Sequence, residues 1–465
     1  MRTFANRFAS RVLTRLLTNP LHWSPESIVI IGFAAAIGLG GIMLWLPVSH
    51  TPGSVSLLNA LFTSTSAVCV TGLTVVDTAK DFNHVGQMII VILIQLGGLG
   101  WMVFAALIFG MLGRNLSLKS QVALADSLMQ RTAANDIAQI VGRIILITGT
   151  IELTGILLLF LFLLPDHPVK QALFSAVFHG ISAFCNAGFS IYSENLLSFR
   201  ANWPVLTIIL LLIVLGGLGH TVLIEIWQVF SLRSKRESNS IFRFSLHART
   251  VFWASALLIV GGTLGILLFG MPGEEKSLPE KIGGAIFQSV TARTAGFNSI
   301  RIGALPPASL LFVTILMFIG GSPGSCAGGV KTTSMAIWLS RLVARLRGSD
   351  EVTLFGKTIS HQIVRRTTLL FALAVGWNLF GILLLLSTEN LQPGFGLQDV
   401  MFEQVSAFAT VGLSTGLTPH LSMIGRVWLI CSMFMGRVGP LTIAAWIVEK
   451  KRVRIQHPEG RIMVG

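Results

Sequence analysis

The stretch FATVGLSTG, from Phe408 to Gly416, recurs three more times along the chain in altered form. Its partners are FTSTSAVCVTGLTVVD around Gly72, FHGISAFCNAGFSIYS around Gly188 and FQSVTARTAGFNSIR around Gly296. Successive glycines of the series are 116, 108 and 116 residues apart, and each is followed by a large apolar residue and then a small polar one. Self-similarity at a regular spacing is the mark of a repeated structural unit. The sequence therefore predicts four copies of one unit.

Two further sets of residues support this alignment. Ten residues before the glycine stand Phe62, Phe178, Ile286 and Phe402, and six and five before it stand Ser66-Ala67, Ser182-Ala183, Val290-Thr291 and Ser406-Ala407. Downstream lies a second glycine mark, QLGGLG from Gln95, VLGGLG from Val214, MFIGGSPG from Met317 and FMGRVG from Phe434, whose first glycine follows the first set of glycines by 24 to 28 residues. The third copy has diverged most, but we expect it to keep the common register.

The chain is strongly apolar over its 465 residues. Hydrophobic residues make up 52%, charged residues 12%, and the mean hydropathy is +0.75, whereas soluble domains carry about 25% charged residues. No charged residue lies between Glu26 and Asp77, which accommodates one spanning helix of about 20 residues and a second apolar element. Neutral or nearly neutral runs follow at 82–113, 144–164, 201–224, 250–273, 302–330, 367–388 and 427–448. The composition predicts an all-α integral membrane protein with eight spans.

The basic residues behind the formal charge of +14 lie mainly in the termini and in alternate connections between these spans. Basic residues gather in the N-terminal segment, in the segments 114–143, 233–249 and 341–366, and in the tail from Lys450. By the positive-inside rule, both termini and these three connections are cytoplasmic. The basic excess therefore indicates a lipid membrane and no nucleic acid. Residues 1–24 fit a targeting peptide or an amphipathic helix on the inner leaflet, and the long apolar run that follows favours the helix.

The repeated unit has a short apolar segment that cannot cross a bilayer. The segments 55–68 and 397–409 are too short to span and end in non-helical backbone, which is tolerated at membrane depth only where it is buried or lines water. Each half-helix then directs its partially negative C-terminal end toward the centre, which favours a cation. Glycine lets consecutive carbonyls turn toward the axis, and Thr410-Val411-Gly412-Leu413 differs by one aromatic residue from the TVGYG filter of potassium channels. We therefore expect four pseudo-fourfold units around one pore, with eight spanning helices and four re-entrant half-helices.

These four units, together with GGSPGSCAGGVKTT from Gly320 to Thr333, resemble the Trk/Ktr/HKT superfamily of potassium-translocating subunits. The first glycine unit follows the first spanning helix without an extra helical pair, so the chain is most similar to the shorter KtrB-type subunit. The resemblance implies a selectivity filter built from backbone carbonyls of Val70, Thr71 and Gly72; Asn186, Ala187 and Gly188; Thr294, Ala295 and Gly296; and Thr410, Val411 and Gly412. Glycine in all four units implies a preference for potassium. Transport or coupling of sodium is left open.

The resemblance further implies that residues 320–331 form an intramembrane gate loop under the filter. Its expected members are Gly320, Gly321, Ser322, Gly324, Ser325, Gly328, Gly329 and Lys331, with Arg437 opposite them. A simple helix kink is the alternative, because glycine and proline also break a helix. Lys331 could equally anchor the inner leaflet, and Arg437 could instead form a structural bridge to Glu225 or Glu152. Polar groups within the bundle, namely His179, Glu403, Glu152 and Glu225, are expected to be satisfied there and not to ligate ions.

The predicted organisation divides the chain at its charged connections. It comprises a cytoplasmic amphipathic segment 1–24, pore units 25–113, 139–230, 247–346 and 362–449, cytoplasmic connections 114–138, 231–246 and 347–361, and a tail 450–465. The resemblance implies a bacterial inner-membrane homodimer on a cytosolic ring of RCK-type nucleotide-binding proteins. The basic inner loops and the tail HPEGRIMVG are the expected docking surfaces.

Nothing in the sequence indicates an enzyme. It contains no P-loop and hence no nucleotide site, and no His/Cys/Asp cluster with metal-ligand spacing. The four cysteines, Cys69, Cys185, Cys326 and Cys431, are expected to be small buried hydrophobes. A secondary transporter coupled to sodium or protons is the main alternative, but inverted repeats would alternate in orientation, whereas the four units share one. An intramembrane hydrolase would need a nucleophile and a base on facing helices, and neither stands out.

Overall fold

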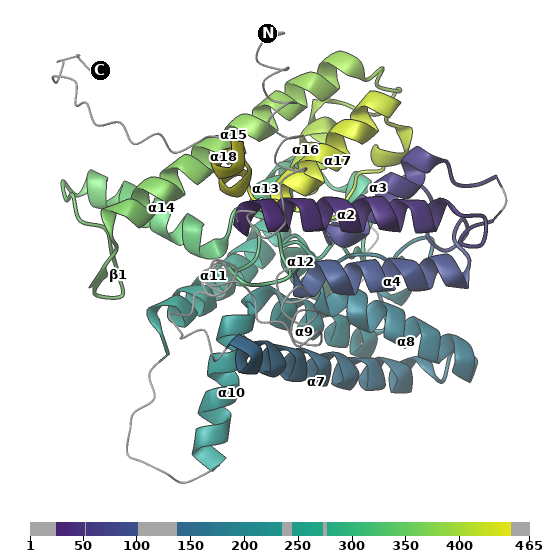
Figure 1. Cartoon of the computed structure of the whole chain (residues 1–465), viewed down its shortest axis with the longest axis horizontal. Helices are drawn as coiled ribbons and strands as arrows, with labels where there is room; N and C mark the ends of the chain where they lie inside the picture. Colours follow the sequence, from purple (N-terminus) through teal and green to yellow (C-terminus); the bar gives the residue numbers. More distant parts are fainter. Residues whose placement is uncertain (1–24, 52, 101–136, 235–243, 273–276, 448–465) are drawn as a thin grey trace.

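The computed structural model describes residues 25–51, 53–100, 137–234, 244–272 and 277–447. The predictions for the N-terminal segment 1–24 and the tail 450–465 lie outside these residues, as does nearly all of the connection 114–138. The described chain is helical apart from its loops and one two-stranded hairpin (Figure 1).

Each of the four units opens with a long apolar helix. These are α2 (Pro25–Trp45), α7 (Ile137–Leu163), α11 (Leu246–Phe269) and α15 (His361–Thr388). One leucine on each, namely Leu39, Leu153, Leu257 and Leu383, is between 64% and 72% exposed, as expected for side chains that face lipid. Among the described residues, three helices are long and apolar enough to cross a membrane, or four if the bent pair α9–α10 counts as one span.

The second element of each unit is a half-helix. These are α3 (Leu57–Val68), α8 (Val169–Phe184), α12 (Leu278–Thr291) and α16 (Leu397–Ala409). Their 12 to 16 residues span about 18 to 24 Å, which is less than the roughly 30 Å of a hydrocarbon core. Side chains cap three of them: Ser56 accepts from Asn59 N, Ser277 from Glu280 N, and Asp399 from Gly396 N. The predicted re-entrant segments are thus present as helices.

The third element of each unit is shorter than the sequence predicted. Helices α4 (His84–Leu99), α9 (Trp203–Leu218) and α17 (Met423–Val438) end at Gly100, Gly219 and Gly439, whose φ values are 83°, 94° and 92°. A glycine with positive φ ends a helix, so these helices end where continuous spanning helices were expected. After the break, α9 turns by 102° into α10 (His220–Ser234) and α17 leads into α18 (Pro440–Ile447).

Unit 3 breaks in a different way. Helix α13 (Pro307–Phe318) stops two residues before Gly320, the first glycine of the second glycine mark, and a loop of residues 319–331 leads to α14 (Thr332–Leu346). We call residues 319–331 the intramembrane loop. A hairpin of β1 (Thr353–Leu354) and β2 (Lys357–Thr358) then connects α14 to α15. Single 3-10 turns lie at η3 (Leu197–Phe199), η4 (Ile302–Ala304) and η5 (Thr418–His420).

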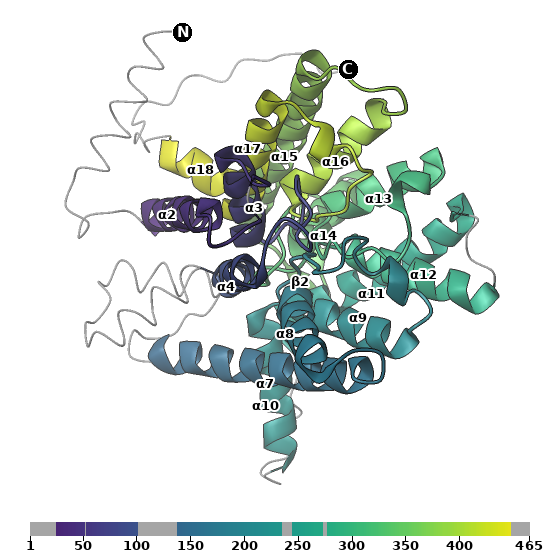
Figure 2. The same ribbon diagram turned by 90° about the vertical axis from the view of Figure 1, so that its right-hand side faces the viewer.

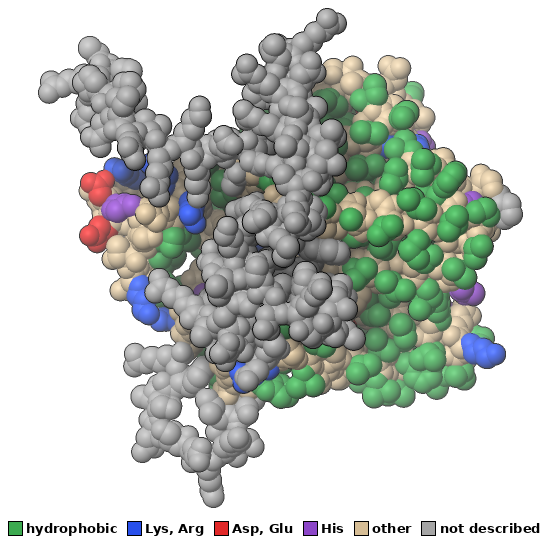
Figure 3. Space-filling view, in the orientation of Figure 1, with side chains coloured by type: hydrophobic (Ala, Val, Ile, Leu, Met, Phe, Trp, Pro, Cys, Tyr) green, Lys and Arg blue, Asp and Glu red, His purple; other side chains and the backbone are tan. Residues whose placement is uncertain are grey.

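The four units surround one axis in sequence order (Figure 2). The third helix of every unit packs on the half-helix of the next: α4 on α8, α9 on α12, α13 on α16, and α17 back on α3. Arg426 of α17 closes the ring by donating to Asn59 Oδ1 of α3 at 2.9 Å. Apolar side chains dominate the described face in Figure 3, and the acidic side chains visible there gather at its left-hand end. The expected all-α membrane fold is confirmed.

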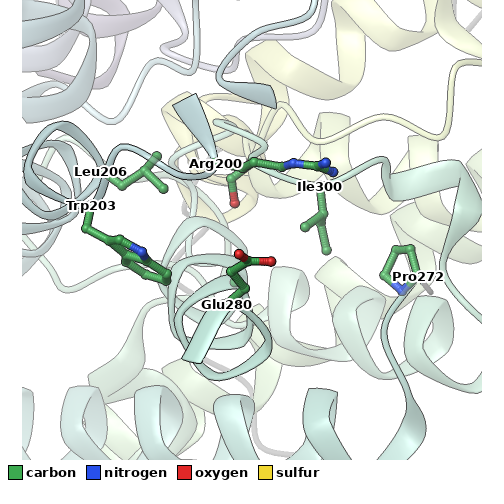
Figure 4. Close-up of a pocket in the computed structure, with 8 residues that line it drawn as sticks. Arg200, Trp203, Leu206, Pro272, Glu280 and Ile300 are labelled. Carbon is green, nitrogen blue, oxygen red and sulfur yellow. The ribbon is translucent and has the colours of Figure 1, made fainter. Parts of the chain in front are cut away.

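A small cavity marks the seam between units 2 and 3 (Figure 4). Arg200, Trp203 and Glu280 lie around it, and its volume of about 30 Å³ is enough for little more than one water molecule. Trp203 packs against Gly283 of α12, where no larger residue would fit. The cavity therefore belongs to the packing between units and is too small for a ligand.

Candidate functional site

The four glycine loops, residues 70–72, 186–188, 294–296 and 410–412, share one unusual backbone conformation. The first residue of each has a left-handed φ, at 57° for Val70, 59° for Asn186, 70° for Thr294 and 51° for Thr410. The glycine has one too, at 95° for Gly72, 68° for Gly188, 76° for Gly296 and 91° for Gly412. The left-handed region is unfavourable for non-glycine residues, and such strain clusters at functional sites. Four equivalent outliers therefore indicate a site built by all four units.

The loops close into a ring in which each glycine faces the next unit. A Cβ added to Gly188 would lie 2.7 Å from the carbonyl oxygen of Ala295, and one on Gly296 would lie 2.5 Å from that of Val411. In the same way Gly72 faces the carbonyl of Ala187, and Gly412 faces that of Thr71. Contacts of this length leave no space for a side chain, so only glycine fits. The structure thus brings all twelve predicted filter residues together around one axis.

Hydroxyl groups near the C-terminal ends of the half-helices hold the loops from behind. Ser66 Oγ accepts from Gly72 N at 3.0 Å, and Ser406 Oγ accepts from Gly412 N at 3.1 Å. Ser182 Oγ donates to Phe189 O at 2.8 Å, and Ser406 Oγ donates to Leu413 O at 2.6 Å. The serine of the predicted Ser-Ala pair therefore fixes the backbone of the glycine loop in units 1, 2 and 4.

Unit 3 keeps this arrangement with a different register from the predicted one. Thr291 Oγ1 donates to Phe297 O at 2.6 Å, so Thr291 takes the role of the serine although it stands five residues before Gly296. Phe287 is 2% exposed, as buried as its counterparts in other units, whereas Ile286 is only partly buried. The predicted alignment through Ile286 and Val290 is wrong by one residue. The connection from hydroxyl to glycine is one residue shorter in this unit.

The second glycine mark has a packing role in three units. A Cβ on Gly97, Gly216 or Gly436 would strike the last carbonyls of the half-helix in its own unit, at Val68, Phe184 and Phe408 respectively. In unit 3 the equivalent Gly320 faces Gly328 O of the intramembrane loop instead. The mark therefore permits close approach of a helix to the C-terminal end of a half-helix.

The intramembrane loop lies directly beneath the glycine loop of unit 4. A Cβ on Gly328 would strike the side chain of Thr410, and one on Gly329 would lie 3.2 Å from Ala409 Cα. The loop also binds the broken end of unit 2, because Ser322 N donates to Gly217 O at 3.1 Å and His220 N donates to Gly324 O at 2.9 Å. The loop therefore crosses from unit 4 to unit 2.

Polar contacts fold the loop back on its own ends. Gly320 N donates to Val330 O at 2.9 Å and Thr332 N donates to Gly321 O at 3.0 Å. Ser325 Oγ donates to Ser322 O at 2.6 Å. The ammonium of Lys331 donates to Ala327 O, so of its two predicted roles the structure favours a contact within the loop. A simple kink would not produce such a compact, internally bonded segment.

Arg437 binds two backbone carbonyls from two other units. Its guanidinium donates to Cys326 O in the intramembrane loop and to Gly97 O at the end of α4. The alternative of a bridge to Glu152 or Glu225 is wrong: Glu152 accepts from Gln95 Nε2 at 3.0 Å, and Glu225 accepts from Ser245 Oγ at 2.7 Å. A planar guanidinium suits such a bidentate bridge because its donors are fixed in a fork.

The other predicted polar groups are satisfied, as expected. His179 Nε2 lies 3.0 Å from Ser190 Oγ, and Glu403 accepts from Ser414 Oγ at 2.5 Å. Of the cysteines, Cys69, Cys185 and Cys326 are buried, whereas Cys431 is exposed on α17, so its predicted burial is wrong.

Two features match a path for ions. Three threonine hydroxyls of the glycine loops are buried without a hydrogen-bond partner among the described residues: Thr71 Oγ1, Thr294 Oγ1 and Thr410 Oγ1. Outside the ring, a cavity of about 390 Å³ is bordered by Gly72 and Gly188 and by the carboxylates of Asp77 and Asp81. No cluster of metal-ligating side chains occurs in the described parts of the chain.

Comparison with known proteins agrees with this architecture. The family model described as "TrkH: Cation transport protein" matches residues 3–453. The chain is 36% identical to Ktr system potassium uptake protein B of Bacillus subtilis, over 96% of this chain and 98% of that protein. It is 34% identical to potassium/sodium uptake protein NtpJ of Enterococcus hirae, over 95% and 97%.

A solved structure shares the fold. The potassium transporter TrkH from Vibrio parahaemolyticus superposes with a TM-score of 0.68 at 19% identity, covering 92% of this chain and 86% of that one. The likeness at this identity concerns the fold alone. The family model and the relatives, by contrast, extend over nearly the whole chain, and the chain belongs to the TrkH family of cation transport proteins.

Proposed function

We propose that this protein carries potassium into the cell, and that the glycine loops are its selectivity filter. The observation that carries the proposal is the closed ring of carbonyls, in which each filter glycine faces the carbonyl of the next unit. Carbonyl oxygens can replace the hydration shell of a potassium ion, and four half-helices direct their negative ends at the same place. The names of the relatives support potassium as the ion.

Sodium is a second ion to test. One relative is named a potassium/sodium uptake protein, so sodium either accompanies potassium or is carried in its place under some conditions. The test is uptake of radioactive rubidium and sodium by vesicles that contain the purified protein. Rubidium uptake that unlabelled potassium abolishes and sodium barely affects supports the filter. Equal competition by both ions contradicts it.

The intramembrane loop acts as the gate, with Arg437 as its tether. Its contact with Thr410 supports this role, because a loop against the first residue of the unit 4 filter loop can close one end of the ring. The gate comprises the loop residues Gly320 to Gly329 named above, Lys331, and Arg437 from unit 4. A positive charge beneath the filter also raises the barrier for a cation.

We infer the membrane, the orientation and the partners of this protein from its basic residues and from the names of its relatives. We place the chain in the bacterial inner membrane with both termini in the cytoplasm, on the distribution of basic residues. The word "system" in the names of the Ktr relatives supports a membrane subunit that works with a partner. We infer a homodimer on a cytosolic RCK-type ring that binds the regulatory nucleotide. A transporter coupled to sodium or protons is the alternative mechanism, which transport against a potassium gradient would reveal.

A further inference from the structure

One position on the half-helices differs among the units in a way that repetition does not explain. The residue after the buried phenylalanine is Thr63 in unit 1, His179 in unit 2, Gln288 in unit 3 and Glu403 in unit 4. All four side chains are polar, and none is more than 2% exposed. Burying a polar group without a hydrogen-bond partner costs free energy, so we compared the partners of these four side chains behind the filter.

In unit 4 this residue binds the chain that leaves the filter. Glu403 Oε1 accepts from Ser414 Oγ at 2.5 Å and from Thr415 N at 3.0 Å, and Oε2 accepts from Thr418 Oγ1 at 2.5 Å. Hydrogen bonds to a carboxylate are about twice as strong as neutral ones. Ser406, one helical turn further along, holds Gly412 and Leu413. Together the two side chains of α16 fix residues 412–418.

Unit 2 has a similar brace made with histidine. His179 Nδ1 donates to Ser175 O at 2.8 Å, since a carbonyl can only accept. In the neutral ring, Nε2 then accepts from Ser190 Oγ at 3.0 Å. Ser190 and Ser414 both stand two residues after their filter glycine. The ring of Tyr192 stacks on that of His179 with centroids 4.9 Å apart, so the imidazole is also held from its face.

Units 1 and 3 lack this brace. Within the described chain, Thr63 Oγ1 has no hydrogen-bond partner, and neither has the amide oxygen or nitrogen of Gln288. Because the units follow one another around the axis, units 2 and 4 face each other across the pore. All four loops are held by the hydroxyls described above, but only units 2 and 4, on opposite sides of the filter, have this second brace.

We propose that Glu403 is a positioning residue for ion selection, which keeps the far end of the unit 4 filter loop fixed against the ion, and that His179 plays the same role in unit 2 across the pore. The proposal rests on the filter assignment above. Without the brace, the filter loop can move toward the axis until its carbonyls contact a smaller ion. Loss of the brace should therefore reduce discrimination against sodium. Glu403 does not touch the ion itself.

The test is the ratio of rubidium to sodium uptake in vesicles that contain the purified full-length protein. Glu403→Ala should lower the ratio about tenfold, the equivalent of 1.4 kcal/mol, which is close to the lower end of the roughly 1.5 to 3 kcal/mol of a single hydrogen bond to a charged group. Glu403→Gln keeps one acceptor oxygen and should restore part of the ratio. If Glu403→Ala does not reach the membrane, Thr418→Val removes one donor at nearly constant shape and should lower the ratio by a smaller factor.

Two matched controls separate positioning from general structural damage. Asp399→Asn alters the other buried carboxylate of α16, which caps the helix start by accepting from Gly396 N at 2.8 Å. Thr63→Ala alters the equivalent position of unit 1. Both should keep the wild-type ratio. An unchanged ratio in folded Glu403→Ala, or an equal drop in Asp399→Asn, would overturn the proposal, whereas a wild-type protein without potassium preference would overturn the filter assignment instead.

Discussion

Replacing Arg437 should open the pathway, because this residue ties the intramembrane loop to two other units. The guanidinium donates to Cys326 O and Gly97 O, and Arg437→Ala removes both bonds. A hydrogen bond from a charged group contributes about 1.5 to 3 kcal/mol. Loss of the bond to the loop alone should therefore raise the open population about 10- to 160-fold while the closed state dominates.

Arg437→Lys distinguishes the tether from the charge. A lysine retains the positive charge beneath the filter, but its compact ammonium lacks the fork that reaches two carbonyls. If the tether holds the gate, Arg437→Lys should also raise flux, to a value between wild type and Arg437→Ala. If the charge alone limits flux, the lysine variant should behave as wild type.

The assay is rubidium uptake by vesicles at matched protein content, with the melting temperature of each variant measured in parallel. Arg426→Ala is the control, since Arg426 lies on the same helix α17 and donates to Leu421 O and Asn59 Oδ1 near the outer surface. That variant loses the same charge without touching the loop and should not raise flux.

Shortening the loop within 321–328 provides the second half of this test. Flux should rise while the preference for potassium persists, and the combination with Arg437→Ala should be less than additive because both changes act on one element. Lower flux or altered ion preference would mean that the loop supports the filter. An additive double variant would separate Arg437 from the gate.

Three further predictions concern the filter, the bundle and the partners. Gly72→Ser should admit sodium or abolish transport in a protein that still reaches the membrane, because a Cβ there strikes Ala187 O; wild-type preference in uptake assays would refute the assignment at that unit. Gln95→Leu removes the amide that donates to both carboxylate oxygens of buried Glu152 and should destabilise the protein by about 1 to 3 kcal/mol, seen as a lower melting temperature; an unchanged value would contradict this pairing. The protein should copurify as a dimer with a cytosolic ring whose bound nucleotide changes flux, and a fully active monomer indifferent to such proteins would rule this out.

The fourfold ring was predictable because glycine records a local backbone requirement. Gly72 and its three counterparts are left-handed and pressed against a neighbouring carbonyl, so no other residue fits, and the pattern is visible without any long-range information. The alignment of unit 3 through Ile286 and Val290 is wrong because this unit has one residue fewer between its hydroxyl and its glycine. The spacing of four between Phe287 and Thr291, which equals that between Phe62 and Ser66, would have revealed the shift.

Two other features, the partners of Arg437 and the ends of three helices, could not be predicted because the sequence carries no signal for them. Arg437 binds two backbone carbonyls, and any residue type supplies a carbonyl, so the sequence placed Arg437 opposite the loop without identifying Cys326 or Gly97 as its partners. The breaks at Gly100, Gly219 and Gly439 fall within or beside apolar runs that continue beyond them. Apolar length predicted a continuous span there, and only the left-handed conformation of each glycine ends the helix.

The central claim is that the four glycine loops bind a dehydrated potassium ion. The most direct measurement is anomalous diffraction from crystals of the protein soaked in thallium, a heavy analogue of potassium. We predict density on the axis of the ring, between the carbonyls of Gly72, Gly188, Gly296 and Gly412, that potassium displaces and sodium does not. Thallium density that is absent from the ring, or that sodium displaces as readily as potassium, would contradict the account.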